Sequence, residues 1–308
     1  MKYLNLIRYK NLLLLAFMQL VVLFGFLKMQ NIPLALALWQ YYLLVISTVC
    51  IAAGGYIIND IMDQEVDGIN KPKKAIIGHS VSENLAYNIY VGLTLAGVGL
   101  GFYLSKVIMR PNFVTVFILC AALLYIYATS FKRIIIVKNV AVAFLLAFSI
   151  LIIDLFMIFP ATDSTNREQM LPVFSVLIDF SLIAFLINLL REIVKDLEDI
   201  NGDYNAGIQT LPVALGVART TKLVFGLSFI PTASILYYIY VNLFELQFAT
   251  VYILGFIVGP LLYFSIKIWS AKNKKDYSHL GDVLKLIIFF GIIAIAVIGI
   301  NMKYYAAQ

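Results

Sequence analysis

The strongest constraint on this chain is that its apolar residues run together in segments long enough to cross a membrane. Of its 308 residues, 62% are hydrophobic and 13% are charged, whereas a soluble domain carries roughly 25% charged residues. A helix needs about 20 mostly apolar residues to span a bilayer, so nine spans are predicted. They cover residues 11–28, 38–58, 85–105, 113–130, 135–159, 172–194, 219–241, 248–270 and 284–302. We therefore expect an all-α, polytopic membrane protein, which excludes a soluble enzyme and a nucleic-acid-binding domain.

The basic residues predict how these spans are oriented. With a cytoplasmic N-terminus, 18 of the 23 Lys and Arg residues fall on the cytoplasmic side. The other five are Lys28, Lys106, Arg110, Arg167 and Lys303. Because basic residues concentrate in cytoplasmic loops, we predict a multi-pass protein of the cell inner membrane with its N-terminus inside. No separate soluble domain is visible, so residues 1–308 are expected to form one membrane domain. No obligate protein partner and no nucleic acid partner are predicted.

Two short acidic clusters interrupt the apolar background at residues 59–67 and 196–203. Both follow the pattern D-x2-D-x3-D and are offset by 136 residues, as in pseudo-repeated halves. The first contains Asp60, Asp63 and Asp67, and the second contains Asp196, Asp199 and Asp203. Positions i, i+3 and i+7 share one face of a helix. Four spans separate the clusters, so both are predicted to lie at the cytoplasmic ends of spans, facing the same side of the membrane.

Carboxylates crowded on one stripe repel one another, and a membrane surface that is already negative increases the cost. A divalent cation removes this cost. Magnesium prefers oxygen ligands, takes one or two carboxylates and fills its other positions with water and substrate phosphate. One cluster alone is equally consistent with a solvated acidic helix end. The matched pair favours Mg²⁺ at both clusters, with a diphosphate between them.

Basic residues accompany both clusters and are candidates for binding the diphosphate. They are Lys71, Lys74, Lys132, Arg133, Arg191 and Lys195. A diphosphate bridged by metal ions keeps excess negative charge, which lysine and arginine would neutralise. Each of these residues taken singly is equally explained by the general preference of basic residues for the cytoplasmic side. Only their position beside the carboxylates makes them candidates.

At these residues the sequence resembles the UbiA superfamily of intramembrane prenyltransferases. The segment from Asn59 to Asp67 matches the family's N-D-x-x-D-x-x-x-D motif, and the segment from Asp196 to Asp203 matches its second Asp-rich motif. Residues 125–139 resemble the segment that joins the family's fourth and fifth helices. After the first motif this chain has lysine, at 71 and 74, where the family usually has arginine. Lysine keeps the charge but lacks the bidentate geometry that fits phosphate oxygens.

The resemblance implies a nine-helix UbiA-type bundle that transfers a prenyl group, with Mg²⁺, from a polyprenyl diphosphate to a lipophilic acceptor in the bilayer. The implied metal ligands are Asn59, Asp60, Asp63, Asp67, Asp196, Asp199 and Asp203, with Asp60 the weaker candidate. The residues closest to the chemistry are expected to be Asp63, Asp67, Asp199 and Asp203. Candidate substrate contacts are Tyr125, Tyr127 and Asn188.

The acceptor is less constrained. Residues 191–203 look most like family members that transfer geranylgeranyl to geranylgeranylglyceryl phosphate in ether-lipid synthesis. An aromatic acceptor in quinone synthesis, such as 4-hydroxybenzoate or a dihydroxynaphthoate, is the alternative. A CDP-alcohol phosphotransferase is disfavoured because Gln64 stands where that family has glycine. A transporter is disfavoured because transporter sites lie near the membrane midplane, whereas these acids follow the ends of spans.

Glycines inside the third predicted span raise a separate question, because glycine-rich segments also bind phosphate. Gly97, Gly99 and Gly101 lie within an apolar run of this span. Small residues at this spacing let membrane helices approach closely. We therefore expect these glycines to contact a neighbouring helix.

Overall fold

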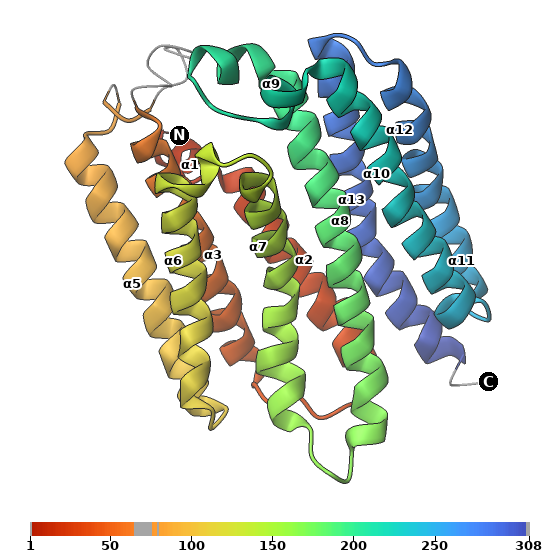
Figure 1. Cartoon of the computed structure of the whole chain (residues 1–308). Helices are drawn as coiled ribbons and strands as arrows, with labels where there is room; N and C mark the ends of the chain where they lie inside the picture. Colours follow the sequence, from red (N-terminus) through yellow and green to blue (C-terminus); the bar gives the residue numbers. More distant parts are fainter. Residues whose placement is uncertain (1, 65–75, 79, 306–308) are drawn as a thin grey trace. The chain divides into compact units, whose positions relative to one another are not determined.

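The computed structural model describes residues 2–64, 76–78 and 80–305, and these are predominantly helical (Figure 1). Among them the only β-pairing is an isolated bridge between Ile77 and Val81. Nine helical stretches in this described part are long and apolar enough to span a membrane. They are Tyr9–Met29, Leu38–Met62, Glu83–Val107, Pro111–Thr129, Val137–Ala161, Arg167–Asn205, Val217–Leu243, Gln247–Ser270 and Lys274–Tyr305. Each overlaps one predicted span, so the all-α membrane architecture is confirmed.

The division between the fourth and fifth spans falls where the sequence predicts it. Helix α6 (Val114–Thr129) is followed by a 3-10 turn, η4 (Phe131–Arg133), and α7 begins at Val137 and runs to Ile153. Ile136, directly before α7, has a φ of 69°, a left-handed conformation that branched side chains rarely adopt. The short connection therefore keeps Lys132 and Arg133 between two membrane helices.

The sixth span is much longer than its apolar run. Helix α8 (Arg167–Asn205) has 39 residues, which at 1.5 Å per residue is about 58 Å, against about 30 Å of hydrocarbon. It continues past the predicted end at residue 194 because Ile193, Val194 and Leu197 remain buried. The second acidic cluster is consequently carried on a continuous helix that extends beyond the hydrocarbon region.

The helices group into two compact units. Unit 1 comprises residues 1–19, 33–134 and 152–166, and unit 2 comprises residues 20–32, 135–151 and 167–308. In unit 1, α3 (Leu38–Met62) packs along α5 (Glu83–Val107) and α6 (Figure 1). The short helix α1 (Lys2–Leu6) packs against the C-terminal part of α3, where Leu6 is buried with Ile57 and Ile58. This packing fixes the end of α3 that carries the first acidic cluster.

Of the three α5 glycines for which a helix contact is predicted, Gly97 and Gly101 behave as expected. A Cβ at Gly97 would lie 2.6 Å from Ile51 Cγ1 and 3.0 Å from the carbonyl oxygen of Ser47, and a Cβ at Gly101 would meet the ring of Phe117. The hydroxyl of Ser47 also donates a hydrogen bond of 2.7 Å to the Gly97 carbonyl. The expectation for Gly99 was wrong, because no atom outside its own helix lies within 4 Å of a Cβ built there.

Gly97 and Gly99 provide a matched pair for testing the packing of α3 against α5. Gly97→Ala is expected to destabilise the protein by about 1–3 kcal/mol, the usual cost of overpacking. Gly99→Ala is expected to stabilise it by up to about 1 kcal/mol, because alanine is the better helix former. Thermal unfolding of both variants in detergent checks this. A lower Tm for Gly99→Ala than for Gly97→Ala would contradict the packing.

In unit 2, α8 packs along α13 (Lys274–Tyr305), and α10 (Val217–Tyr238) packs against both α8 and α12 (Gly259–Ser270). The short helix α9 (Leu211–Leu215) joins α8 to α10. The remaining segments complete the spans: α2 (Tyr9–Val21), η1 (Val22–Phe26), η2 (Leu27–Met29), η3 (Pro111–Phe113), η5 (Asp154–Ile158), η6 (Phe159–Ala161), η7 (Ile239–Leu243), α11 (Gln247–Ile253) and η8 (Leu254–Val258).

Polar contacts tie the helices of unit 2 together inside the core. The hydroxyls of Thr221 and Tyr277 are 3.0 Å apart, which joins the start of α10 to the start of α13. Those of Ser228 and Ser265 are 2.8 Å apart, which joins α10 to α12. All four residues are buried, and buried hydroxyls are stable only when they are hydrogen-bonded. The N-terminal end of α10 is thereby fixed beside that of α13.

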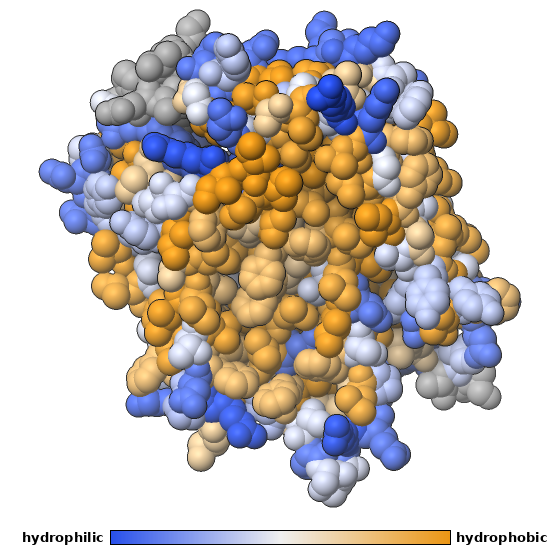
Figure 2. Space-filling model, in the orientation of Figure 1, coloured by the Kyte–Doolittle hydropathy of each residue, from blue (hydrophilic) through white to orange (hydrophobic). Residues whose placement is uncertain are grey.

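The helix surfaces are largely apolar, as lipid contact requires. Figure 2 shows hydrophobic residues along the helices, with hydrophilic residues concentrated toward helix ends. Among the exposed side chains are Leu95 (68%) in unit 1 and Ile266 (70%) in unit 2. A soluble protein rarely exposes so much contiguous apolar surface. The protein is therefore an integral membrane protein.

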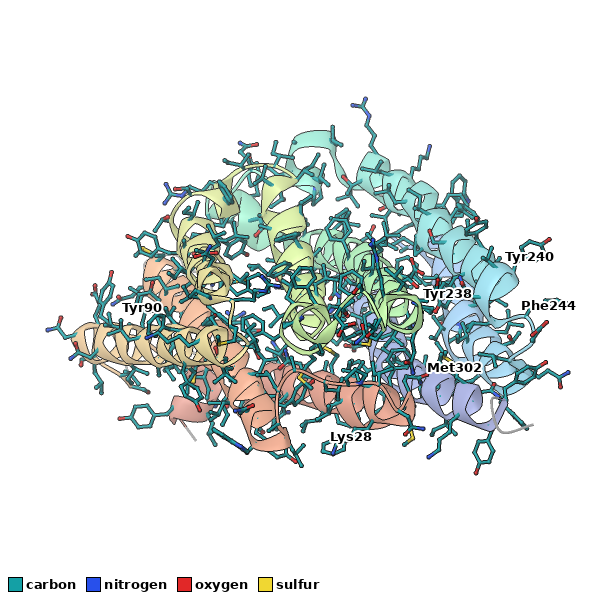
Figure 3. All side chains as sticks on the ribbon, turned by 90° about the horizontal axis from the view of Figure 1, so that it is seen from below. Lys28, Tyr90, Tyr238, Tyr240, Phe244 and Met302 are labelled. Carbon is teal, nitrogen blue, oxygen red and sulfur yellow. The ribbon has the colours of Figure 1, made fainter. Side chains whose placement is uncertain are left out.

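A surface hollow of about 690 Å³ lies in unit 2 at the end of α10. Tyr240 and Phe244 approach it from the segment after α10, and Met302 approaches it from the end of α13 (Figure 3). Among the described residues that line it, Glu245 is the one with a charged side chain. The hollow is at the opposite end of α10 and α13 from the second acidic cluster, and its described lining residues include no lysine or arginine to bind a diphosphate.

Candidate active site

The first acidic cluster lies at the C-terminal end of α3, in unit 1. Asn59 and Asp60 belong to the last turn of the helix, and Asp63 is its C-terminal capping residue. The Asn59 side-chain amide donates a hydrogen bond of 3.0 Å to Asp63 Oδ2. Lys132 Nζ is 2.6 Å from Asp63 Oδ1, with both side chains mostly buried. Three predicted site residues are therefore brought together, two from α3 and one from the turn after α6.

Asp60 points to a different partner. Its Oδ1 is 2.9 Å from Nη2 of Arg8, a residue between α1 and α2. The Arg8 guanidinium also lies 5.0 Å from the centre of the Tyr56 ring. Partial burial disfavours the charged guanidinium, but attraction to Asp60, with smaller contributions from Tyr56 and Tyr127, raises the pKa of Arg8 above its ordinary value. Asn59 and Asp63 thus form one contact and Asp60 another.

The second cluster lies near the C-terminal end of α8, in unit 2, and its first carboxylate is the most enclosed. Asp196 is 6% exposed. Its Oδ1 is 2.7 Å from Lys138 Nζ, and its Oδ2 accepts a hydrogen bond of 2.9 Å from the Asn139 side chain. Both partners come from the first turn of α7. A buried carboxylate is stable only with such compensation, so the start of α7 fixes the Asp196 side chain.

The other two carboxylates of the second cluster are more accessible. Asp199 Oδ1 is 3.7 Å from Lys274 Nζ at the start of α13, and these side chains are 30% and 68% exposed. Oδ2 of Asp203 is buried and has no hydrogen-bond partner among the described residues. The same is true of Oδ1 of Asn139. Unit 2 therefore presents two buried oxygen atoms that lack a donor, close to Asp196.

Buried oxygen acceptors without a donor are what a hard cation binds. The candidate ligands in unit 2 are the oxygen atoms of three carboxylates (Asp196, Asp199 and Asp203) and of the Asn139 amide, and this set of oxygen ligands fits Mg²⁺. The fit in unit 1 rests on Asn59 and Asp63. Within the described residues no three His, Cys, Asp or Glu side chains converge closely enough to hold a metal ion without rearrangement. Lys132 and Lys138 now hold the carboxylates that a cation would take.

The other predicted residues divide into three groups. Arg191 and Lys195 both lie on α8 beside Glu192, at 3.2 Å and 3.8 Å respectively. Arg133 and Tyr125 are exposed, Tyr127 is half-buried, and Asn188 is buried and donates to the carbonyl of Ala184 on its own helix. Asp67, Lys71 and Lys74 lie outside the described residues.

Sequence reasoning missed four ion-pair partners of the predicted site residues: Arg8 beside Asp60, Lys138 beside Asp196, Lys274 beside Asp199, and Glu192 beside Arg191 and Lys195. The three cations had been explained only by the positive bias of the cytoplasmic side. Asn139 is the last residue of the segment 125–139 that resembles the family, but the sequence predicts no role for it. The available signal was position, because Lys138 and Asn139 lie at the start of a span that follows a basic turn.

Comparison with known proteins gives consistent matches. A digeranylgeranylglyceryl phosphate synthase of Korarchaeum cryptofilum is 38% identical over 56% of this chain and 56% of its own length. The protein of the same name from Methanopyrus kandleri is 34% identical over 60% and 61%. The chain thus matches less than two thirds of the length of these relatives. The Sulfolobus acidocaldarius protein of that name is 32% identical over 71% of both chains.

Solved structures share the fold. One described as a digeranylgeranylglyceryl phosphate synthase in membranes has a TM-score of 0.70 and 23% identity, covering 97% of this chain and 98% of that one. A UbiA homologue from Archaeoglobus fulgidus bound to GPP and Mg²⁺ has a TM-score of 0.63 and 18% identity, covering 96% and 99%. Residues 18–293 match the UbiA prenyltransferase family. The chain belongs to the UbiA prenyltransferase family.

Proposed function

We propose that this protein transfers a prenyl group from a polyprenyl diphosphate to a lipophilic acceptor and depends on Mg²⁺. The observation that carries the proposal is the pair of acidic clusters at one spacing, each with a carboxylate bound by a lysine from a neighbouring segment. Asp63 with Lys132 and Asp196 with Lys138 are these two pairs. The Mg²⁺ bound by the Archaeoglobus fulgidus homologue supports the choice of metal.

The residues that would hold Mg²⁺ are Asn59, Asp63 and Asp67 from the first cluster and Asp196, Asp199 and Asp203 from the second. When bound, the metal neutralises the diphosphate and makes it a better leaving group. A cation bound at Asp63 and Asp196 would take the place of Lys132 and Lys138 beside these carboxylates. Each lysine would then have a free ammonium group with which to bind a diphosphate oxygen. Lys71 and Lys74 are proposed to add charge from the loop after the first motif.

The reaction itself breaks the bond between the allylic C1 and the diphosphate oxygen, and the electron pair leaves with the diphosphate. An acceptor hydroxyl oxygen attacks C1 and forms the ether bond, and its proton passes to water. Negative charge develops on the leaving oxygen, so fixed cations lower the barrier most. Arg133, Arg191 and Lys195 are proposed to contribute to this positive field. Tyr125, Tyr127 and Asn188 are proposed to contact the substrates.

For the acceptor we propose geranylgeranylglyceryl phosphate, with geranylgeranyl diphosphate as donor. The relatives named digeranylgeranylglyceryl phosphate synthase support this choice, as does the likeness of residues 191–203 to that branch. We also propose that the N-terminus and both acidic clusters face the cytoplasm. Residues 1–308 would act as one catalytic domain, because ligands for a single diphosphate come from both clusters.

The acceptor is tested by offering purified protein labelled geranylgeranyl diphosphate, Mg²⁺ and one acceptor at a time. We expect a labelled ether lipid with geranylgeranylglyceryl phosphate and no product with 4-hydroxybenzoate or a dihydroxynaphthoate. If product formed only with an aromatic acceptor, the proposed acceptor would be wrong, but the proposed reaction, prenyl transfer, would stand. Absence of diphosphate release with every acceptor would contradict prenyl transfer itself.

A further inference from the structure

Three aromatic side chains form an outward-facing cluster between α10 and α12 in unit 2. The ring centres of Phe225 and Trp269 are 4.7 Å apart, and those of Phe225 and Phe229 are 5.0 Å apart. Trp269 is 59% exposed and Phe229 is 49% exposed. The cluster is therefore not core. The buried hydrogen bond between Ser228 and Ser265 holds the two helices together beneath it.

This cluster lies at the end of unit 2 that carries the second acidic motif. Trp269 precedes the last residue of α12, and Phe225 is in the third turn of α10. The hydrogen bond between Thr221 and Tyr277 joins the starts of α10 and α13, and Lys274 at the start of α13 contacts Asp199. Tryptophan at the end of a membrane span typically lies at headgroup depth. The three rings are therefore placed where lipid headgroups meet acyl chains.

Basic side chains lie near the same ends of α10 and α12 as the rings. Lys222 is one helical turn before Phe225, so the two are neighbours on the surface of α10, and Arg219 is one further turn toward the start of that helix. Lys272 follows Trp269 by three residues, and all three basic residues are exposed. Asp276 is the acid nearest to Lys272 along the chain, and its carboxylate accepts hydrogen bonds from the backbone amides of Lys272 and Asn273. The three basic residues and Asp276 together carry a positive excess.

We propose that this surface, made of Phe225, Phe229, Trp269, Lys222 and Lys272, binds the headgroup of an anionic lipid. The lipid phosphate lies between the two lysines, and the upper part of an acyl chain packs on the aromatic rings. Charge complementarity selects an anion, and the exposed rings select one with an apolar tail over a soluble phosphate. The site is outside both acidic clusters and does not depend on the proposed reaction.

The chain offers a direct test because it contains only two tryptophans, Trp39 and Trp269. Trp39→Phe leaves Trp269 as the single tryptophan, which is excited selectively at wavelengths where tyrosine does not absorb, and a brominated acyl chain quenches tryptophan on contact. The variant is reconstituted in phosphatidylcholine vesicles with a minor fraction of brominated lipid. That lipid is either phosphatidylglycerol or phosphatidylcholine. We expect stronger quenching by the anionic brominated lipid at equal mole fraction, and we expect salt to weaken the difference.

Reversing the charges should remove the selectivity. In the Trp39→Phe background, Lys222→Glu with Lys272→Glu is expected to lower the anionic enrichment at Trp269 by at least about fivefold. Lys303→Glu, a single charge reversal at the opposite end of α13, is the control for a general effect of charge and should change nothing. If the double reversal does not fold, Lys222→Gln with Lys272→Gln is expected to give a smaller loss in the same direction.

Several outcomes would overturn the proposal. Equal quenching by the two brominated lipids would show that no anionic lipid is selected. If both double variants still preferred the anionic lipid, residues other than Lys222 and Lys272 would be responsible for the preference. Loss of the selectivity on adding inorganic phosphate would indicate a soluble-anion site. Prenyl transfer is measured in parallel, and its presence or absence changes none of these results.

Discussion

Asp63→Ala and Asp199→Ala are each expected to abolish turnover while the protein still inserts and folds. Both residues are central members of their motifs, and both are partly exposed, at 22% and 30%. Removing either would delete a proposed metal ligand from the proposed site, where charge would develop on the leaving oxygen. Losing one such stabilising group typically costs at least about a hundredfold in kcat. The measurement is release of diphosphate from labelled geranylgeranyl diphosphate by purified variants.

Asp282→Ala is the matched control for both substitutions. Asp282 is also an aspartate on a helix of unit 2, but it is 67% exposed and contacts Lys285 one turn away. Exposed pairs of this kind contribute little to stability, so its turnover should equal that of the parent protein. Full activity in Asp63→Ala or Asp199→Ala would overturn the assignment of the site. Equal loss in all three variants would point to a general effect of removing charge.

The second large effect is expected at Lys138. Lys138→Met leaves Asp196 buried with only the Asn139 amide as partner, and breaking a buried ion pair from one side typically costs about 3–5 kcal/mol. We expect a marked fall in Tm in detergent and loss of turnover. The loss of stability comes from the uncompensated charge and not from the missing side-chain volume, since methionine fills similar space.

A second substitution separates these causes. In Lys138→Met with Asp196→Leu, no buried charge remains, so we expect most of the lost stability to return. Turnover should stay absent, because a member of the second cluster has been removed. A double variant as unstable as Lys138→Met would contradict the electrostatic explanation. A double variant with normal turnover would remove both residues from the proposed site.

The membrane fold was largely predictable from the sequence because bilayer thickness dictates the length of apolar segments. The boundary between α6 and α7 was predictable for the same reason, since Lys132 and Arg133 interrupt the apolar run. The extent of α8 was not. Beyond residue 194 the sequence of this helix is mostly polar, but Leu197 remains buried. A criterion based on the length of an apolar run does not detect a single buried residue among polar ones.

The acidic clusters were predictable because identical spacing can be read directly from the chain. Their partners were not, since spacing along the sequence says nothing about which segment approaches each carboxylate. Lys132 is predicted to bind diphosphate because it lies between two spans, and it contacts Asp63. Lys138, equally basic and six residues later, is not predicted as a site residue, although it contacts Asp196. Arg8 contacts Asp60 because the burial of Leu6 holds the N-terminal segment against α3.

The central claim is that the two acidic clusters together hold one diphosphate through divalent cations. The most direct measurement is calorimetric binding of geranylgeranyl thiodiphosphate, a slowly reacting analogue of the donor, to the protein with Mg²⁺ and after its chelation. We predict binding with Mg²⁺ only, lost in Asp63→Ala and equally lost in Asp199→Ala. Binding that persists after chelation, or that survives loss of either cluster, would contradict the claim.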